Sequence, residues 1–192
     1  MARIVLASGS PRRQELLQRI GITDFDVRVP EADETYPPGL SPQEVVTTIS
    51  RKKADAAALL CTPEEIVITA DTMVFLDDQR LGKPTDEADA LRMLTDLQGR
   101  HHTVCTGVTV RQGSHSVTEC ETTEVRFRSA SQEELLAYIA TKEPMDKAGS
   151  YGIQGKGALL VEEIHGDFFN VMGLPVLRLS RILEQFGVSL LK

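Results

Sequence analysis

The chain has 192 residues, of which 41% are hydrophobic and 26% are charged, and its formal net charge is −7. This length suits one compact domain or one domain divided into two lobes. The acidic balance argues against nucleic acid as a partner, because non-specific nucleic-acid binding requires a basic face. No apolar stretch approaches the roughly 20 residues of a membrane span, and the first residues lack the pattern of a secretory signal. We therefore expect a cytoplasmic protein that binds neither nucleic acid nor membrane.

The spacing of cysteine and histidine gives no sign of a zinc site or a disulfide framework. Cys61, Cys105 and Cys120 are odd in number and widely separated, which favours reduced, buried thiols. His101 and His102 are adjacent, so on a strand they would point to opposite faces. We interpret the four histidines as surface or turn residues.

The first predicted elements are a strand and a helix joined by the corner ASGSPRR. The continuous apolar run RIVLA is typical of a strand covered on both faces. Ser10 suits the N-cap of the helix and Pro11 its first position. Such a corner leaves free backbone N–H groups at the positive end of a helix dipole, and the guanidinium forks of Arg12 and Arg13 suit phosphate. The corner therefore predicts an anion site; a surface arginine pair that bridges carboxylates is the alternative.

A second strand is predicted over residues 25–29. An acidic, proline-rich loop follows, which carries Asp33 and Glu34 and is expected to run over the surface or along the rim of a cleft. The next helix, over residues 41–60, begins with a capping box at Ser41.

Three consecutive basic residues of that helix differ in their predicted exposure. On a helical wheel Lys53 falls near the centre of the apolar stripe, Lys52 at its edge and Arg51 opposite. An ammonium group on a buried face needs a counter-charge or a wet cavity. The alternative is that the lysine extends along the surface into solvent.

One or two strands are predicted over residues 65–76, followed by a hairpin turn over 77–82. Asp71 comes directly after an apolar stretch, and ligands of α/β sheets gather at the carboxyl ends of strands. Asp71 is therefore a candidate metal ligand or general base, with a turn-forming aspartate as the alternative. Lys83 follows the tight turn.

The remaining patterns alternate between helix and strand. They predict, in order, a helix over 87–99, a long antiparallel hairpin over 102–128, a capped helix over 131–140, a glycine-rich functional loop over 143–157, short strands over 158–164 and 168–173, and an amphipathic helix over 174–187. Helices and strands that alternate before a long hairpin indicate an α/β fold with a mixed sheet.

The charged candidates come from separate segments of the chain. A basic clamp together with carboxylates is what a metal-dependent enzyme acting on a polyphosphate requires. The candidates are Arg12, Arg13, Lys53 and Lys83 as cations, and Asp71, Asp33 and Glu34 as acids.

Several motifs, among them ASGSPRRQELL, RKKADAA, ITADTMV and YIATKEPMDKAGSYGIQG, resemble the Maf family of nucleoside triphosphate pyrophosphatases nearly end to end. The resemblance implies one domain over residues 1–192. It implies a mixed, largely antiparallel long sheet flanked by helices, in two lobes around a central cleft (Maf/ITPase-like). It also implies a divalent metal cation (Mg, Mn or Co), a nucleoside triphosphate substrate and a possible homodimer.

The same resemblance assigns roles to individual residues. Asp71 would be the catalytic carboxylate and, with Glu34, a metal ligand, whereas Asp33 is a less certain match. The triphosphate would be held by Ser8, Arg12, Arg13, Lys53 and Lys83.

Three positions, Arg12, Thr72 and Gln154, match the branch of the family that hydrolyses dTTP and UTP, and possibly modified pyrimidine nucleotides, to the monophosphate and pyrophosphate. The sister branch, which prefers 7-methyl-GTP, has tryptophan where this chain has Arg12. A glutamine amide offers a donor and an acceptor, which match the O4 and N3–H edge shared by uracil and thymine. The alternatives are 7-methyl-GTP hydrolysis and a nucleotide-binding regulator of cell division.

Overall fold

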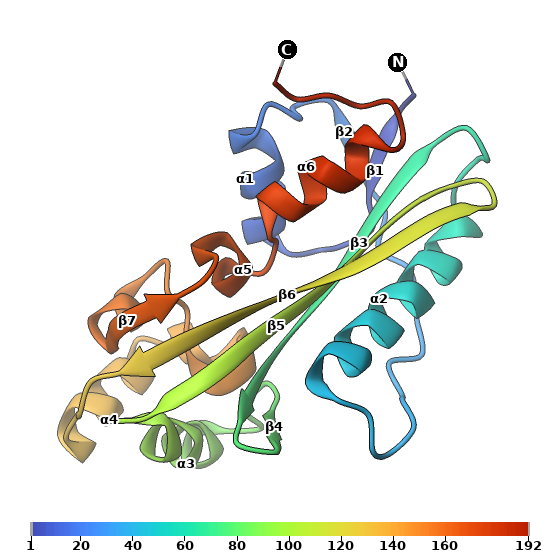
Figure 1. The fold of residues 1–192 in the computed structure, drawn as a ribbon. Coiled ribbons are helices and arrows are strands. Elements are labelled where there is room, and N and C mark those ends of the chain that lie inside the picture. The colour runs from blue at the N-terminus through green and yellow to red at the C-terminus, as the bar shows by residue number, and fades with distance from the viewer. Residues whose placement is uncertain (1, 192) are drawn as a thin grey trace. The chain divides into compact units, whose positions relative to one another are not determined.

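A computed structural model describes residues 2–191, which form one mixed sheet with helices (Figure 1). The strand order is β2-β1-β3-β5-β6-β7, and β4 pairs with β3. β1 pairs in parallel with β2 and β3, whereas β4 and β7 pair antiparallel with β3 and β6. The strands are β1 (Ile4–Leu6), β2 (Phe25–Val27), β3 (Ile66–Leu76), β4 (Gln79–Leu81), β5 (His101–Gln112), β6 (His115–Phe127) and β7 (Val161–His165). The predicted α/β class with a mixed sheet is confirmed.

The helices occupy most of the positions that the sequence predicts. They are α1 (Pro11–Arg19), α2 (Pro42–Ala58), α3 (Glu87–Leu97), α4 (Gln132–Ala140), α5 (Phe168–Met172) and α6 (Val176–Glu184), with 3₁₀ turns η1 (Glu143–Asp146), η2 (Ala148–Ser150) and η3 (Lys156–Leu159). Among residues 2–191, no helix combines the length and the apolar character needed to cross a bilayer.

The chain divides into two compact units. The first comprises Met1–Asp71, Thr106–Glu121 and Gly173–Lys192, and the second Thr72–Cys105 and Thr122–Met172. The long strands β3, β5 and β6 each contribute residues to both units. Each unit therefore positions its own set of candidate residues.

Three predicted helix starts are confirmed by their side-chain caps. Ser10 accepts a hydrogen bond from the N–H of Arg13 at the start of α1, and Pro11 occupies the first position. Ser41 and Ser131 each form a capping box, in which the carboxylate of the glutamate three residues later accepts the backbone N–H of the serine. These contacts span three residues, so the sequence alone is sufficient to predict them.

The predicted strand over residues 168–173 is wrong, because this segment forms the helix α5. The carboxylate of Asp167 accepts hydrogen bonds from the N–H groups of Phe169 and Asn170, at 2.7 and 3.2 Å, and so caps a helical turn. The buried Asn170 amide then donates to the carbonyl of Val104 and to Thr123 Oγ1. Residues 66–76 form a single strand, which is one of the two predicted forms, whereas 3₁₀ turns occupy much of residues 143–159, where a loop and the start of a strand are predicted.

The histidines and cysteines follow the predictions only in part. His101 is exposed and its neighbour on β5, His102, is buried, as strand alternation requires, so the surface interpretation is wrong for His102. None of the three cysteines, all within the described residues, forms a disulfide; Cys105 is buried, whereas Cys61 and Cys120 are only partly buried.

In the first unit α2 lies directly against β5 at Gly107. A Cβ atom at this position would lie 2.4 Å from the carbonyl oxygen of Val46 in α2, so only glycine permits the contact. Buried hydroxyls add polar links between the same elements: Ser50 Oγ lies 2.8 Å from Thr109 Oγ1, and Thr69 Oγ1 donates to the carbonyl of Ser50 at 2.8 Å. These contacts set the height and rotation of α2 over the sheet.

We predict that Gly107→Ala lowers the free energy of unfolding by about 1–3 kcal/mol, because the opposing atoms belong to helix backbone that cannot rotate away. Urea unfolding followed by circular dichroism measures the change. Gly82→Ala is the matched control, since nothing lies within 4 Å of a Cβ there, and its effect should stay within about 0.5 kcal/mol. Equal stabilities for the two variants would show that α2 does not depend on this contact.

Candidate functional site

The corner between β1 and α1 is organised around the side chains of Ser8 and Arg13. Arg13 Nη1 donates to Ser8 Oγ at 3.1 Å, and Arg13 Nε donates to the carbonyl of Gly173 at 2.8 Å. Ser8 Oγ also accepts the N–H of Ser10 at 3.3 Å. The guanidinium of Arg13 is therefore turned inward. The contact to Gly173 joins residues far apart in the sequence and was not predicted.

Arg13 is half-buried, and its electrostatic surroundings connect the corner to the acidic candidates. Burial lowers the pKa of Arg13 to about 10, the charges of Asp71 and Glu34 act in the opposite direction, and that of Arg12 lowers it further. The group remains a cation at neutral pH. Two arginines, a glutamate and an aspartate thus interact across separate segments of the first unit.

Lys53 of α2 forms ion pairs with both acidic candidates. Its Nζ lies 2.7 Å from Asp71 Oδ1 and 3.0 Å from Glu34 Oε1. The Lys53 side chain is 17% exposed and that of Asp71 is 9% exposed, so this pair is largely desolvated, whereas Glu34 is 55% exposed. Of the two interpretations of Lys53, the counter-charge is therefore correct. Its neighbours follow the predicted gradient, since Lys52 is partly exposed and Arg51 is exposed.

Asp71 has one oxygen engaged and one available. Oδ1 accepts from Lys53, whereas Oδ2 is buried and has no hydrogen-bond partner among the described residues. Desolvating a carboxylate oxygen without a partner is costly, and such exceptions concentrate where a ligand or an ion completes the site. The position near the carboxyl end of parallel β1 and along β3 is where α/β sheets gather ligands.

Asp33 has a different role from its neighbour Glu34. Its carboxylate accepts from the backbone and hydroxyl of Thr35 at 2.9 and 2.8 Å, and from Lys52 Nζ at 2.9 Å. The hydrogen bonds from Thr35 and then Lys52 lower the pKa of Asp33 to about 2. Asp33 thus anchors the acidic loop to α2, and this anchoring leaves Glu34 beside Lys53.

The other predicted site residues, Thr72, Lys83 and Gln154, belong to the second unit. Thr72 follows Asp71 on β3 and is half-buried, whereas Lys83 and Gln154 are exposed. The segments that carry Lys83 and the glycine-rich loop are linked by the N–H of Gly149, which donates to the carbonyl of Gly82 at 3.1 Å.

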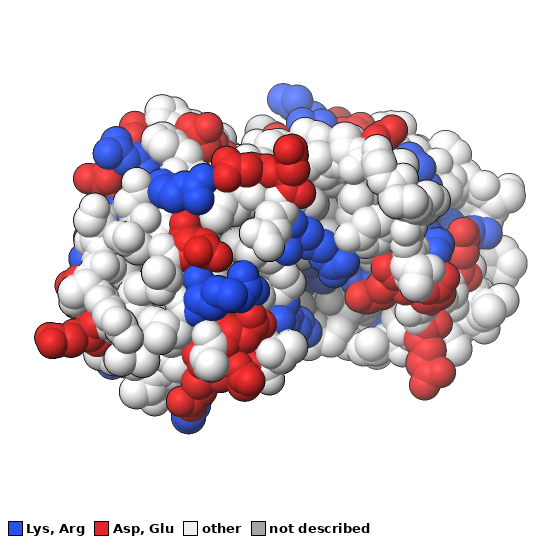
Figure 2. Space-filling view, turned by 90° about the horizontal axis from the view of Figure 1, so that it is seen from below, with Lys and Arg blue, Asp and Glu red and all other residues white. Residues whose placement is uncertain are grey.

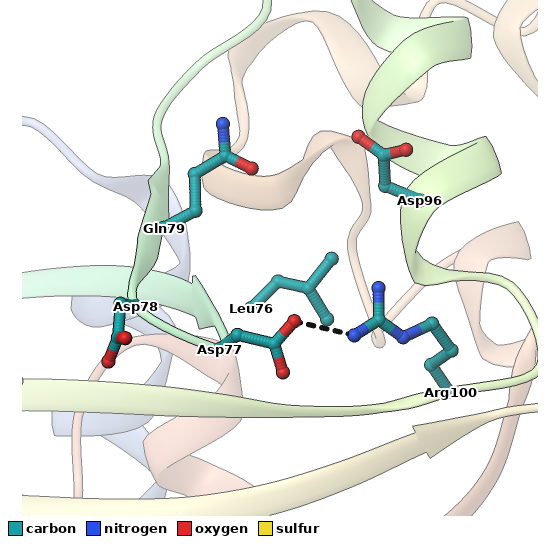
Figure 3. Close-up of a pocket in the computed structure, with 6 residues that line it drawn as sticks. All are labelled: Leu76, Asp77, Asp78, Gln79, Asp96 and Arg100. Atoms are coloured by element: carbon teal, nitrogen blue, oxygen red, sulfur yellow. Dashed lines mark hydrogen bonds and ion pairs between the residues drawn. The ribbon is translucent and has the colours of Figure 1, made fainter.

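Charges of both signs are interspersed on the face drawn in Figure 2. An open pocket in the second unit, shown in Figure 3, contains the 2.6 Å ion pair between Asp77 and Arg100. None of the predicted site residues lines this pocket, and carboxylates outnumber cations on its walls. Such a lining disfavours a polyphosphate, so the pocket is not the site that the sequence predicts.

Comparisons with known proteins agree with the sequence resemblance. Residues 3–186 match the family model described as Maf-like protein. A dTTP/UTP pyrophosphatase of Bacillus cereus is 48% identical over 189 residues, 98% of each chain, and one of Acetivibrio thermocellus is 48% identical over 200 residues, covering 100% of this chain and 99% of the relative. A solved HAM1 protein from Coxiella burnetii is similar in fold, with a TM-score of 0.50, 14% identity, and coverage of 96% and 100% of the two chains.

We predict that Lys53→Met destabilises the protein by about 1–3 kcal/mol, because it leaves the buried carboxylate of Asp71 without its donor. Combining it with Asp71→Asn should cost less than the sum of the single changes, since the uncompensated charge is then absent. Urea unfolding of the four proteins in this cycle measures the coupling. Arg51→Met, on the exposed face of α2, should change stability by no more than about 0.5 kcal/mol. Additive effects in the cycle would contradict the pairing.

Proposed function

The chain belongs to the family of Maf-like proteins, and from this premise we propose that it is a dTTP/UTP pyrophosphatase. It hydrolyses the nucleoside triphosphate to the monophosphate and pyrophosphate. The observation that carries the proposal is the Lys53–Asp71 ion pair, beside which Asp71 Oδ2 is buried and has no hydrogen-bond partner among residues 2–191. The charge of Asp71 also acts on Arg13. Curated relatives of that name, 48% identical over nearly the whole chain, support it.

The proposed triphosphate site begins at the β1–α1 corner. Ser8, Arg12 and Arg13 would donate to phosphate oxygens there, next to the N-terminus of α1. Lys53 would neutralise charge from α2, and Lys83 of the second unit would hold another phosphate oxygen. Cations preorganised in this way stabilise the negative charge that develops on the departing pyrophosphate, and such electrostatic stabilisation contributes most of the rate enhancement in phosphoryl transfer.

The proposed mechanism begins with a water molecule held by Asp71. Oδ2 of Asp71 accepts a proton from the water molecule as the water oxygen attacks the α-phosphorus. Lys53 donates to Oδ1 and so holds the carboxylate in place. The bond between the α-phosphorus and the bridging oxygen breaks, and pyrophosphate leaves with the electron pair. The arginines and lysines hold its charge, and the proton on Asp71 returns to solvent.

The residues present fit a divalent metal cation such as Mg, Mn or Co. Asp71 Oδ2 is a buried hard oxygen without a hydrogen-bond partner in the described part of the chain, and Glu34 contacts the same Lys53 ammonium as Asp71. Within residues 2–191, no three acidic, histidine or cysteine side chains gather as a complete ligand set. Mg²⁺ is commonly held by one or two carboxylates together with phosphate oxygens and water. A metal bound by Asp71 and Glu34 would neutralise triphosphate charge and polarise the α-phosphoryl group.

Selection of the base is proposed to depend on Arg12, Thr72 and Gln154. The amide of Gln154 would pair with O4 and N3–H of uracil or thymine, and a base that leaves such groups unpaired is penalised strongly. Cytosine presents the reverse donor and acceptor at these positions. The proposal therefore includes rejection of CTP.

The remaining expectations follow from this substrate. The whole chain, residues 1–192, would act as one nucleotide pyrophosphatase domain. It would work in the cytoplasm, where nucleoside triphosphates are made and consumed, with neither nucleic acid nor membrane as a partner. A homodimer stays a prediction of the family resemblance.

We predict that Asp71→Asn lowers kcat for pyrophosphate release from dTTP and UTP by roughly 10²–10⁴-fold, the usual contribution of a general base, with a small change in KM. A coupled phosphate assay across dTTP, UTP, CTP, GTP, 7-methyl-GTP and ATP measures both the loss and the substrate preference. Asp78→Asn, an exposed residue of the β3–β4 turn, is the control and should retain full activity. An Asp71→Asn enzyme within a few-fold of the parent would remove Asp71 from this role.

Chelation of divalent cations is predicted to abolish pyrophosphate release, and added Mg²⁺, Mn²⁺ or Co²⁺ to restore it. Glu34→Gln should raise the Mg²⁺ concentration needed for half-maximal activity by roughly tenfold, because it removes one charged ligand. A titration of activity against free Mg²⁺ measures this shift. Full turnover in excess chelator would rule out the metal.

A further inference from the structure

We propose that Glu143, together with Tyr138, is a positioning residue that holds the loop 152–157 in one conformation and thereby fixes how Gln154 presents its amide to the base. This inference rests on the proposed function and deepens it by naming what makes the loop selective. Residues 151–153 and 157 are buried, whereas 154–156 are exposed. The loop therefore exposes three residues, Gln154 among them, between buried residues on both sides.

A single carboxylate and a single phenol bind the backbone at both ends of this loop. Glu143 Oε1 accepts from the hydroxyl of Tyr138 at 2.8 Å and from the N–H of Gly157 at 3.0 Å, and its Oε2 accepts from the N–H of Lys156 at 2.9 Å. The Tyr138 hydroxyl in turn accepts the N–H of Gly152 at 3.1 Å. Three loop N–H groups thus depend on two side chains outside the loop.

The loop is packed so tightly that Gly155 and Gly157 have no room for a side chain. A Cβ atom at Gly155 would lie 2.3 Å from Glu143 Oε2, and one at Gly157 would lie 2.4 Å from the carbonyl oxygen of Gly152. Gly155 therefore permits close packing on the Glu143 carboxylate, and Gly157 permits close packing on the backbone of Gly152.

A third anchor lies directly before the loop. The buried Tyr151 hydroxyl lies 2.7 Å from His102 Nε2, and the Tyr151 ring packs edge-on against the rings of His102 and Phe127, with centroids 5.3 and 4.7 Å away. Burial, and to a lesser extent the charge of His101, lower the pKa of His102 to about 3, so this anchor stays neutral over the physiological range.

Glu143 remains ionised in this environment. Burial acts to raise its pKa, but hydrogen bonds from Gly157, Tyr138 and Lys156 and the charge of Lys147 outweigh that effect, and the net pKa is lowered. Hydrogen bonds to an ionised acceptor are about twice as strong as neutral ones. The carboxylate therefore holds the loop more firmly than an amide of the same shape would.

Fixing the loop matters because an amide is nearly symmetric in shape. A glutamine that turns freely presents its oxygen or its NH₂ to either side, and so pairs with cytosine as well as with uracil. Discrimination between UTP and CTP requires one orientation to be favoured before binding. Anchors that fix the backbone around Gln154 limit the orientations that its side chain can reach.

The test compares Glu143→Gln and Tyr138→Phe with the parent enzyme. Glu133→Gln is the matched control, because it removes a charge from an exposed position of α4, the helix that also carries Tyr138. We expect the ratio of kcat/KM for UTP to that for CTP to fall roughly tenfold in both loop variants. A tenfold change corresponds to the loss of about one hydrogen bond that distinguishes the two bases. Amide hydrogen exchange over residues 152–157 should accelerate in the same variants, and neither quantity should change in Glu133→Gln.

The outcomes separate this inference from the proposed function. A parent enzyme that releases no pyrophosphate from UTP or dTTP overturns the proposed function, and the inference falls with it. A selective parent whose loop variants lose activity equally for UTP and CTP, or exchange no faster over 152–157, overturns the inference alone, because a purely structural role lowers both activities together. If Glu143→Gln does not fold, the same criteria apply to Tyr138→Phe.

Discussion

Lys53 reaches from α2 to Asp71 on β3 and neutralises a carboxylate that the fold has removed from water. A buried aspartate without a counter-charge would be strongly destabilising, so the candidate site depends on α2 lying close enough to the sheet for this contact. Gly107 permits that approach, since any side chain there would collide with the backbone of Val46. The ion pair that supports Asp71 thus depends on the close packing of α2 against β5.

The same ion pair explains how one carboxylate serves two purposes. One oxygen is committed to Lys53, which fixes the orientation of the group, and the other is left without a partner among the described residues. Rigid support on one side and availability on the other are what a general base or a metal ligand requires. Glu34 reaches this neighbourhood because Asp33 and Lys52 anchor the loop that carries it.

Some carboxylates of this protein are candidate functional groups, whereas others hold loops in place through hydrogen bonds. Asp33 and Glu143 each accept several hydrogen bonds from backbone N–H groups or neighbouring side chains, and each holds a loop that carries a candidate functional residue. In both cases the pKa of the carboxyl group is lowered, so the anchor persists at neutral pH. A count of acidic residues along the sequence does not separate such anchors from ligands, because the distinction lies in which donors surround each group.

Features that follow from short-range sequence patterns were predicted correctly. They are the caps at Ser10, Ser41 and Ser131, the hairpin of β5 and β6 around a short turn, and the inward direction of Lys53 on its helix. The partners that those groups contact could not be predicted in this way. The pairing of Lys53 with Asp71, the burial of His102 and the helical form of residues 168–172 depend on strand order and on contacts between distant segments. Local propensity and periodicity carry no information about such contacts, because their free energy arises only when the segments pack.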